Sequence, residues 1–374
     1  MNNNMIIGNI VNVSTGIIER NKGIVVKDGI INKIIDIKED SDKYIIPGLI
    51  DSHLHLIFSG SSSTLNDFLS SDKDDLYKVA LKNAQDALEV GITTVRDCGS
   101  ISDVSFKLRE DINSGKVTGA RIISSGEAIT SRKGHIYFIG EEADSSLEMV
   151  DKARKLIDKG ADFIKLIISG GNMTPGSKDT IDQYALEEIK EVTNFVHSQG
   201  KKIMAHVHTK EGMEKAIEAG IDYIEHGSWR TSQGIEIDYD LINKMHDKQI
   251  IYCTALPKIY YTNFEEIHKN RIIATLENMK YKDNVVLGTD GGTTNNSVKG
   301  LVDQGIFLQK TGNFTNLEIL QMMTINPGKR IFHGKLGEIQ KGKIADLVIL
   351  NSNPLEDLEN LKDIKEVYKN GERL

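Results

Sequence analysis

The chain has little cysteine, no long apolar run and no excess of positive charge. Its two cysteines, Cys98 and Cys253, are too few for a disulfide framework and too far apart for a Cys-x-x-Cys site, so we interpret them as buried thiols. No apolar stretch approaches the roughly 18 residues of a membrane span. The formal net charge is −8, whereas a nucleic-acid surface requires clustered Lys and Arg. We therefore expect neither membrane nor nucleic acid as a partner.

The first ten residues hold three consecutive asparagines and lack the basic stretch and apolar core of a signal peptide. We accordingly expect a cytoplasmic protein. Charged residues make up 27% and hydrophobic residues 39% of the sequence, which is typical of a globular protein. Because 374 residues exceed what one compact core usually holds, we expect one large domain and a smaller one.

Both ends of the chain carry the pattern of short β-strands. Glycine interrupts β-branched runs between residues 5 and 46, and Asp28-Gly29 between two such runs is a hairpin signal. Two further apolar runs, 344–350 and 367–371, lie near the C-terminus. Because the ends of a barrel lie close in space, we predict that residues 1–48 and 336–374 form one composite β-sandwich domain.

The middle of the chain, residues 49–335, alternates short apolar runs with helical patterns. We count eight runs, at 48–50, 92–95, 121–123, 163–166, 202–205, 221–224, 250–252 and 285–287. Helical patterns lie between most of them and several end on glycine, as at 76–90, 147–159, 184–198 and 212–219. Eight strands alternating with helices predict an α/β fold of the (β/α)8 TIM-barrel type. A doubly wound open sheet would require a glycine-rich phosphate-binding turn after the first strand, and the sequence has none there.

The first apolar run leads into His53-Leu54-His55. Residues at i and i+2 of a strand share a face, so both imidazoles can enter one cavity at the C-terminal mouth of the barrel. Two neutral imidazoles are suitable metal ligands. Because His-x-His alone also occurs by chance, the metal hypothesis depends on further ligands.

Lys165 lies within the apolar run 162–168, where a buried ammonium must find a partner or lose its charge. In a barrel mouth such an amine could act as a base, form a Schiff base, or be carboxylated by CO2 into an anionic metal bridge. The alternative is a structural lysine in a salt bridge.

Three later strands also end in side chains able to bind a metal, namely His206, His226 and Asp290. His208 follows two residues after His206 and could replace it as a ligand, orient it, or face the substrate. Four strand ends of this kind, including the one with His-x-His, predict a metal site at the mouth of the barrel.

These segments together resemble the amidohydrolase superfamily over nearly the whole chain. The resemblance is carried by residues 47–55, Lys165, His206, His226, Gly288-Thr289-Asp290 and the C-terminal segment 342–348. Segments 169–175, 205–209 and 224–227 are similar to the imidazolonepropionase-related branch, which includes dipeptidases acting on Xaa-Pro or on Xaa with a basic or apolar C-terminal residue.

The resemblance implies a binuclear metal site in which a CO2-derived carboxylate on Lys165 bridges two divalent ions. It places one ion on His53, His55 and Asp290 and the other on His206 and His226, with Asp290 as the proton carrier. Zinc is the expected metal, although manganese and iron also accept such ligands.

The candidate substrate-binding residues are less sharply defined. Gly134-His135 and the aromatic residues after it resemble a substrate-facing loop of those peptidases, but Ser131-Arg132-Lys133 departs from the small residues expected before it. His135 and Tyr223 are candidates for binding the oxyanion or a substrate carboxylate, and His208 for facing the substrate. Arg230 and Arg132 are candidates for a substrate carboxylate, with a solvated surface charge as the alternative.

The predicted reaction is amide hydrolysis of a small molecule. A dipeptidase or N-acyl amino acid hydrolase is the first hypothesis, and a cyclic-amide hydrolase of the imidazolonepropionase type is the second. A deaminase is less favoured, because a single-metal site would not need Lys165. A binding protein without activity would be expected to lack a ligand, and the sequence has all of them. A homo-oligomer is left open.

Overall fold

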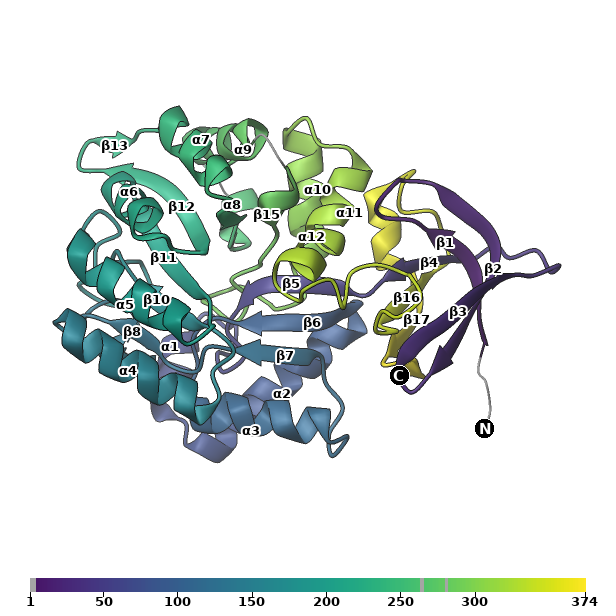
Figure 1. The fold of residues 1–374 in the computed structure, drawn as a ribbon, viewed down its shortest axis with the longest axis horizontal. Helices are drawn as coiled ribbons and strands as arrows, with labels where there is room; N and C mark the ends of the chain where they lie inside the picture. Colours follow the sequence, from purple (N-terminus) through teal and green to yellow (C-terminus); the bar gives the residue numbers. More distant parts are fainter. Residues whose placement is uncertain (1–4, 263–265, 280–281) are drawn as a thin grey trace.

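The computed structural model describes residues 5–262, 266–279 and 282–374, and its larger part is a (β/α)8 barrel (Figure 1). The eight barrel strands overlap the eight predicted runs: β5 (Leu49–Leu54), β6 (Ile92–Asp97), β7 (Arg121–Ser124), β10 (Ile164–Ile167), β11 (Ile203–Thr209), β12 (Tyr223–Thr231), β14 (Ile251–Cys253) and β15 (Val285–Val286). Six neighbouring pairs are parallel ladders. Hydrogen bonds from Asp162 N to Ser124 O (2.9 Å) and from Ser52 N to Leu287 O (3.0 Å) join the remaining edges. The predicted barrel is therefore confirmed.

Helices surround these strands, and the four regions predicted as helical are helices α2 (Lys73–Glu89), α4 (Ser146–Lys159), α5 (Leu186–Ser198) and α6 (Lys210–Ala219). Local sequence explains their ends. Asp72, Ser145 and Thr209 cap three of the N-termini through side-chain oxygens. Gly160 and Gly220 end α4 and α6 in the left-handed conformation, with φ of 104° and 79°.

The other helices are α1 (Thr64–Ser70), α3 (Ser102–Asn113), α7 (Tyr239–Asp247), α8 (Ile259–Thr262), α9 (Glu266–Asn278), α10 (Leu301–Thr311), α11 (Asn316–Met322) and α12 (Ile325–Arg330). Short additional elements are β8 (Ala128–Thr130), β9 (Gly140–Glu142), β13 (Gly234–Ile235), η1 (Tyr137–Ile139), η2 (Lys282–Asn284) and η3 (Leu358–Lys362). Within the described residues, no helix combines the length and the apolarity that crossing a membrane would require.

The two ends of the chain form one β-domain beside the barrel, where both termini lie (Figure 1). Its strands are β1 (Met5–Val11), β2 (Ile18–Lys27), β3 (Ile30–Asp36), β4 (Tyr44–Pro47), β16 (Leu347–Leu350), β17 (Ile364–Lys369) and β18 (Glu372–Arg373). They hydrogen-bond in the order β18-β17-β16-β4-β1-β2-β3, so a single sheet stands where a sandwich was expected. Asp28 and Gly29, with φ of 51° and 77°, turn the predicted hairpin between β2 and β3. The domain limits 1–48, 49–335 and 336–374 stay a prediction.

The β-domain is fixed to the barrel by polar contacts as well as by chain continuity. Arg121 at the start of β7 forms an ion pair with Asp346 (Nη2 to Oδ2, 3.1 Å), whose carboxylate is almost fully buried. The Asp346 carbonyl also accepts a hydrogen bond from Gly48 N (2.8 Å).

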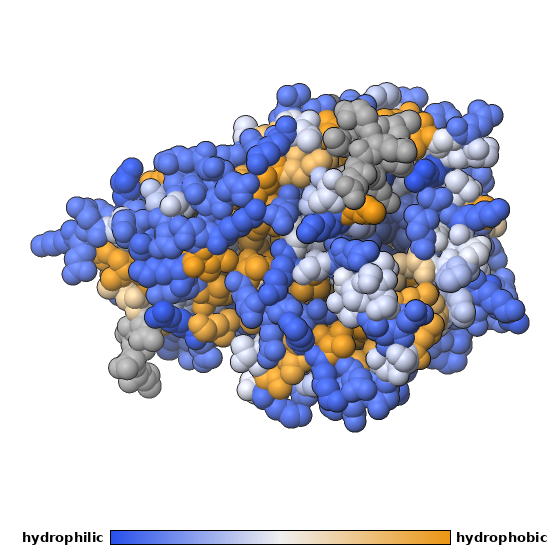
Figure 2. All heavy atoms as spheres, turned by 180° about the vertical axis from the view of Figure 1, so that it is seen from behind, coloured by the Kyte–Doolittle hydropathy of each residue, from blue (hydrophilic) through white to orange (hydrophobic). Residues whose placement is uncertain are grey.

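Hydrophilic residues cover most of the face in Figure 2, and apolar residues appear between them in patches.

Candidate active site

The predicted site residues gather in a cavity of about 320 Å³ within the barrel. All six proposed metal ligands line it, namely His53, His55, Lys165, His206, His226 and Asp290. His135 and His208 line it too, as do Ile136, Asn172, Met173, Pro257, Ile259, Thr293 and Thr294. Strands β5, β10, β11 and β12 carry His53, Lys165, His206 and His226, while His55 directly follows β5 and Asp290 follows β15. The cavity therefore lies at the C-terminal ends of the strands, as expected for this fold.

His53, His55 and Asp290 form the first cluster. The Nε2 atoms of both histidines lie 3.5 Å from Asp290 Oδ1, and the three ligand atoms fall within 4.8 Å of one another. Alternation along β5 brings both imidazoles to one face. Asp290 is turned toward them by a left-handed backbone (φ 54°), and its N–H donates to His53 O (2.8 Å). This arrangement provides three donors for one cation.

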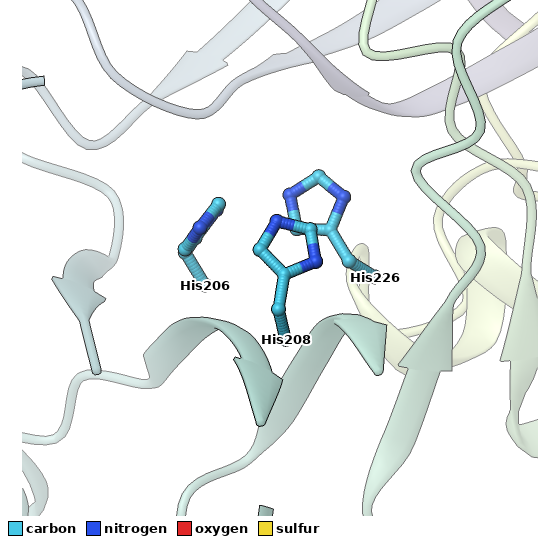
Figure 3. Close-up of side chains that lie close together, drawn as sticks. All are labelled: His206, His208 and His226. Carbon is cyan, nitrogen blue, oxygen red and sulfur yellow. The ribbon is translucent and has the colours of Figure 1, made fainter. Parts of the chain in front are cut away.

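His206, His208 and His226 form the second cluster, and Figure 3 shows their three rings gathered together. The ring centroid of His226 lies 4.6 Å from that of His206 and 4.7 Å from that of His208. His206 and His208 point to one side of β11 because they are two residues apart. His208 Nδ1 lies 2.8 Å from Ser228 Oγ, and His206 Nε2 lies 3.3 Å from Gly170 O. Both histidines approach His226, so this geometry allows either of them to bind a metal together with it.

Lys165 lies in the wall of the same cavity with its side chain almost completely buried. Its Nζ atom has no hydrogen-bond partner among the residues that the structure describes. An ammonium left in this state would pay the full cost of desolvation. The position therefore does not provide the salt bridge that a structural lysine would need.

Burial controls the protonation of the histidines. It holds the pKa of His53, His206, His208 and His226 well below the usual value, and neighbouring cationic groups add to this effect. Burial also lowers the pKa of His135 to about 3. These imidazoles are neutral at physiological pH, which leaves a nitrogen lone pair available to a metal.

Several supporting residues were not assigned a role from the sequence. Asp51 accepts hydrogen bonds from Thr289 Oγ1 (2.6 Å), Thr289 N (3.1 Å) and His53 N (3.1 Å), and burial raises its pKa to about 7. Asn296 Nδ2 donates to Asp290 O (2.7 Å). Asp51 lies two residues before His53, which was a usable signal, whereas nothing in the sequence indicated Asn296.

Asp97 ends β6 and also lies near the site. It accepts hydrogen bonds from Leu56 N (3.1 Å) and Ser124 Oγ (3.2 Å). Burial raises the pKa of its carboxyl to about 6. Arg96 faces Glu225, with Nη1 3.7 Å from Oε1. Asp97 therefore supports the loop after β5.

His135 is brought to the cavity by the loop between β8 and η1. Its ring centroid lies 4.7 Å from that of His206, and its Nδ1 is buried without a hydrogen-bond partner within the described ranges. Gly171 packs against the ring, since a Cβ there would fall 2.6 Å from His135 Nε2. His135 is thus placed to meet a substrate.

The structure corrects the catalytic role considered for Tyr223. This residue opens β12, at the end of the strand opposite the cavity, and its hydroxyl donates to Arg330 O (3.4 Å). It does not appear in the cavity wall as far as the structure describes it. Because β12 begins at Tyr223 and runs from there toward the cavity, the Tyr223 side chain lies too deep in the barrel to reach the cavity.

The two arginine candidates are also engaged elsewhere. Arg230 pairs with Asp179 (Nε to Oδ2, 3.2 Å), and the exposed Arg132 pairs with Asp144 (Nε to Oδ2, 2.9 Å). Neither belongs to the described lining of the cavity. Their role in binding a substrate carboxylate therefore stays a prediction, with no support from the cavity wall.

Gly288 is expected to be essential for metal binding because it lets β15 approach His53. A Cβ at this position would fall 2.6 Å from His53 Cβ and 2.8 Å from Cys253 Sγ. We expect Gly288→Ala to cost about 1–3 kcal/mol of stability and to weaken zinc binding, measured by thermal unfolding and by competition with a chelator. Gly300→Ala is the matched control, since Gly300 has φ of −80° and its nearest neighbour is Tyr261 Oη at 3.2 Å. Equal zinc binding by the two variants would show that Gly288 is not needed for metal binding.

Comparison with known proteins identifies the family. Residues 44–374 match the model of the amidohydrolase family. The chain is 26% identical to ochratoxinase from Aspergillus niger, covering 94% of this chain and 82% of the relative. It is 24% identical to imidazolonepropionase from Clostridium tetani, covering 88% and 84%. A crystal structure of a Xaa-Pro dipeptidase with methionine bound in its active site superposes with a TM-score of 0.86 at 24% identity, covering 99% of both chains. The chain belongs to the amidohydrolase family and is a metal-dependent hydrolase with a histidine-rich metal site.

Proposed function

We propose that this hydrolase is a binuclear metallodipeptidase or N-acyl amino acid hydrolase. One observation carries the proposal: two three-donor clusters line the same cavity as Lys165, whose Nζ has no hydrogen-bond partner among the described residues. A single ion would use one cluster and would leave the buried amine of Lys165 uncompensated. Two ions joined through a carboxylated Lys165 satisfy both clusters and the lysine.

The proposed ligands follow from the two clusters. His53, His55 and Asp290 would hold one ion and His206 and His226 the other, a carboxylated Lys165 would be shared between them, and zinc is the proposed metal. His206 is preferred to His208 as the ligand because of its place in the family resemblance, and His208, whose ring is fixed by Ser228 Oγ 2.8 Å from Nδ1, would face the substrate. Two divalent ions in such a site supply a hydroxide nucleophile near neutral pH and polarise the scissile carbonyl.

The chain's own residues perform the proton transfer and the positioning. The carboxylate of Asp290 accepts the proton of the attacking water and passes it to the leaving nitrogen. Asn296 and the backbone of His53 hold Asp290 in place. His135, whose ring lies at the cavity wall beside His206, binds the developing oxyanion or the substrate carboxylate.

The size and lining of the cavity support a small substrate with an apolar part. Its volume of about 320 Å³ is at the lower end of the range of small-molecule sites. Ile136, Met173, Pro257 and Ile259 supply apolar surface opposite the histidines. The Xaa-Pro dipeptidase of the same fold holds the amino acid methionine in its active site, which supports an amino-acid derivative here too.

The test is the release of amino acids from a library of Xaa-Xaa dipeptides and N-acyl amino acids by the zinc-loaded protein. We expect release from substrates with a proline or apolar residue, and none from a Lys165→Ala variant. No release from any of these substrates, with metal bound, would reject the dipeptidase proposal and favour a cyclic amide as the substrate.

A further inference from the structure

Glu225 lies beneath the first metal cluster, and its side chain is completely buried. Its Oε2 atom is 2.6 Å from His53 Nδ1, the ring nitrogen on the far side from Asp290. Adjacent residues of a regular strand point to opposite faces, yet both Glu225 and His226 approach His53, since the ring centroids of His53 and His226 are 5.3 Å apart. The left-handed backbone of His226 (φ 67°) makes this possible.

Arg96 lies behind Glu225, with a side chain that is only 1% exposed. Its guanidinium carbon lies 4.1 Å from the centroid of the Phe163 ring and 4.0 Å from that of the Tyr223 ring. These contacts fix the arginine between two aromatic rings by cation–π attraction. Its Nη1 atom is 3.7 Å from Glu225 Oε1, the carboxylate oxygen that does not contact His53. A chain of contacts therefore runs from the aromatic rings through Arg96 and Glu225 to His53.

We propose that Glu225 and Arg96 are positioning residues for the metal centre, an inference that rests on the proposed role of His53 as a ligand. Glu225 accepts the hydrogen bond of His53 Nδ1, which fixes the ring and leaves the lone pair on Nε2, 3.5 Å from Asp290 Oδ1. The Arg96 guanidinium, 3.7 Å from Glu225 Oε1 and not hydrogen-bonded to it, offsets the charge of the carboxylate. Tyr223, placed away from the cavity, acts as one of the two rings that hold Arg96.

A buried ion pair can also be merely structural, and burying two charges seldom stabilises a fold by itself. The two roles differ in what they affect. A structural pair contributes to the stability of the metal-free protein, whereas a positioning pair changes how tightly the site binds metal. The decisive readout is thus metal affinity at unchanged fold.

The experiment compares Glu225→Gln and Arg96→Met with the wild type, because both replacements keep roughly the original side-chain length. Zinc affinity is measured by chelator competition, the ligand geometry by the absorption spectrum of the cobalt-loaded protein, and stability by the Tm of the metal-free protein. Arg121→Met is the matched control, since it breaks a buried ion pair, Arg121–Asp346, that is outside the cavity.

We expect zinc affinity to fall about 10- to 100-fold in Glu225→Gln and in the same direction but less in Arg96→Met, with an altered cobalt spectrum in both. Arg121→Met should lower Tm and leave zinc affinity and the spectrum unchanged. Wild-type affinity and spectrum in Glu225→Gln would overturn the proposal, as would failure of both variants to fold. Because the readout is metal binding, it stands apart from the dipeptidase proposal, which fails only if no peptide or acyl amino acid is hydrolysed.

Discussion

Replacing Lys165 with alanine is expected to leave at most one zinc ion per chain and to lower kcat/KM by about a thousandfold or more. The loss of one preorganised hydrogen-bond donor from an active site already costs about 10²–10³ in kcat, and loss of the bridge would also release an ion. Lys165 is buried in the cavity wall without a hydrogen-bond partner in the described part of the chain, so no other group takes over its place. Elemental analysis of the dialysed variant and its kcat/KM on the best dipeptide measure both effects.

Two controls separate this role from general damage. Lys202→Ala removes a half-exposed lysine just before β11, paired with Asp222, and should keep both ions and full activity. Acetate or propionate should partly restore metal content to Lys165→Ala, because a small carboxylate can enter the space left by the side chain. Wild-type metal content and turnover in Lys165→Ala would show that this lysine bridges nothing.

The Asp290→Asn variant is expected to keep its metal and to lose about 10²- to 10⁴-fold in kcat, which is the range for removing a general acid–base group. Asparagine has the shape of aspartate and retains an oxygen facing His53 and His55, which lie 3.5 Å from the present carboxylate. It does not accept and return a proton. The expected pattern is therefore a lower kcat with little change in KM.

Metal analysis decides how an inactive Asp290→Asn variant is interpreted. If an ion is lost together with activity, Asp290 acts chiefly as a ligand. If both ions remain and turnover is normal, the proton-carrier role is refuted. Asp283→Asn, which changes an exposed aspartate paired with Arg330, is the control and should match the wild type in both measurements.

The sequence predicted the barrel and the cluster of ligands because both depend on short periodicities. Apolar runs define the strands, and the spacing of His53 and His55 places both rings on one face of β5. Lys165 lies within its run, and His206 and Asp290 follow theirs, so the geometry of a parallel barrel is enough to bring these side chains to one cavity. The same reasoning placed Tyr223 near the substrate, because a run of apolar residues does not show which of its residues begins the strand.

Other features depend on contacts that a single sequence does not reveal. Arg230 pairs with Asp179, and Arg96 faces Glu225, across separations of more than fifty residues. Glu225 and His226 would point to opposite faces of an ordinary strand. Both side chains nevertheless approach His53, because His226 has a left-handed φ. This conformation is rare outside glycine, and no residue type in the sequence indicates it here. The support of the site was therefore harder to predict than its ligands.

The most direct test of the central claim is X-ray diffraction from crystals of the zinc-loaded protein, recorded at the zinc absorption edge. A binuclear site predicts two anomalous peaks in the cavity, one beside His53, His55 and Asp290 and one beside His206 and His226. Electron density extending from Lys165 Nζ should join them. A single peak, with an unmodified Lys165 turned away from it in an enzyme that hydrolyses its substrate, would contradict the binuclear site.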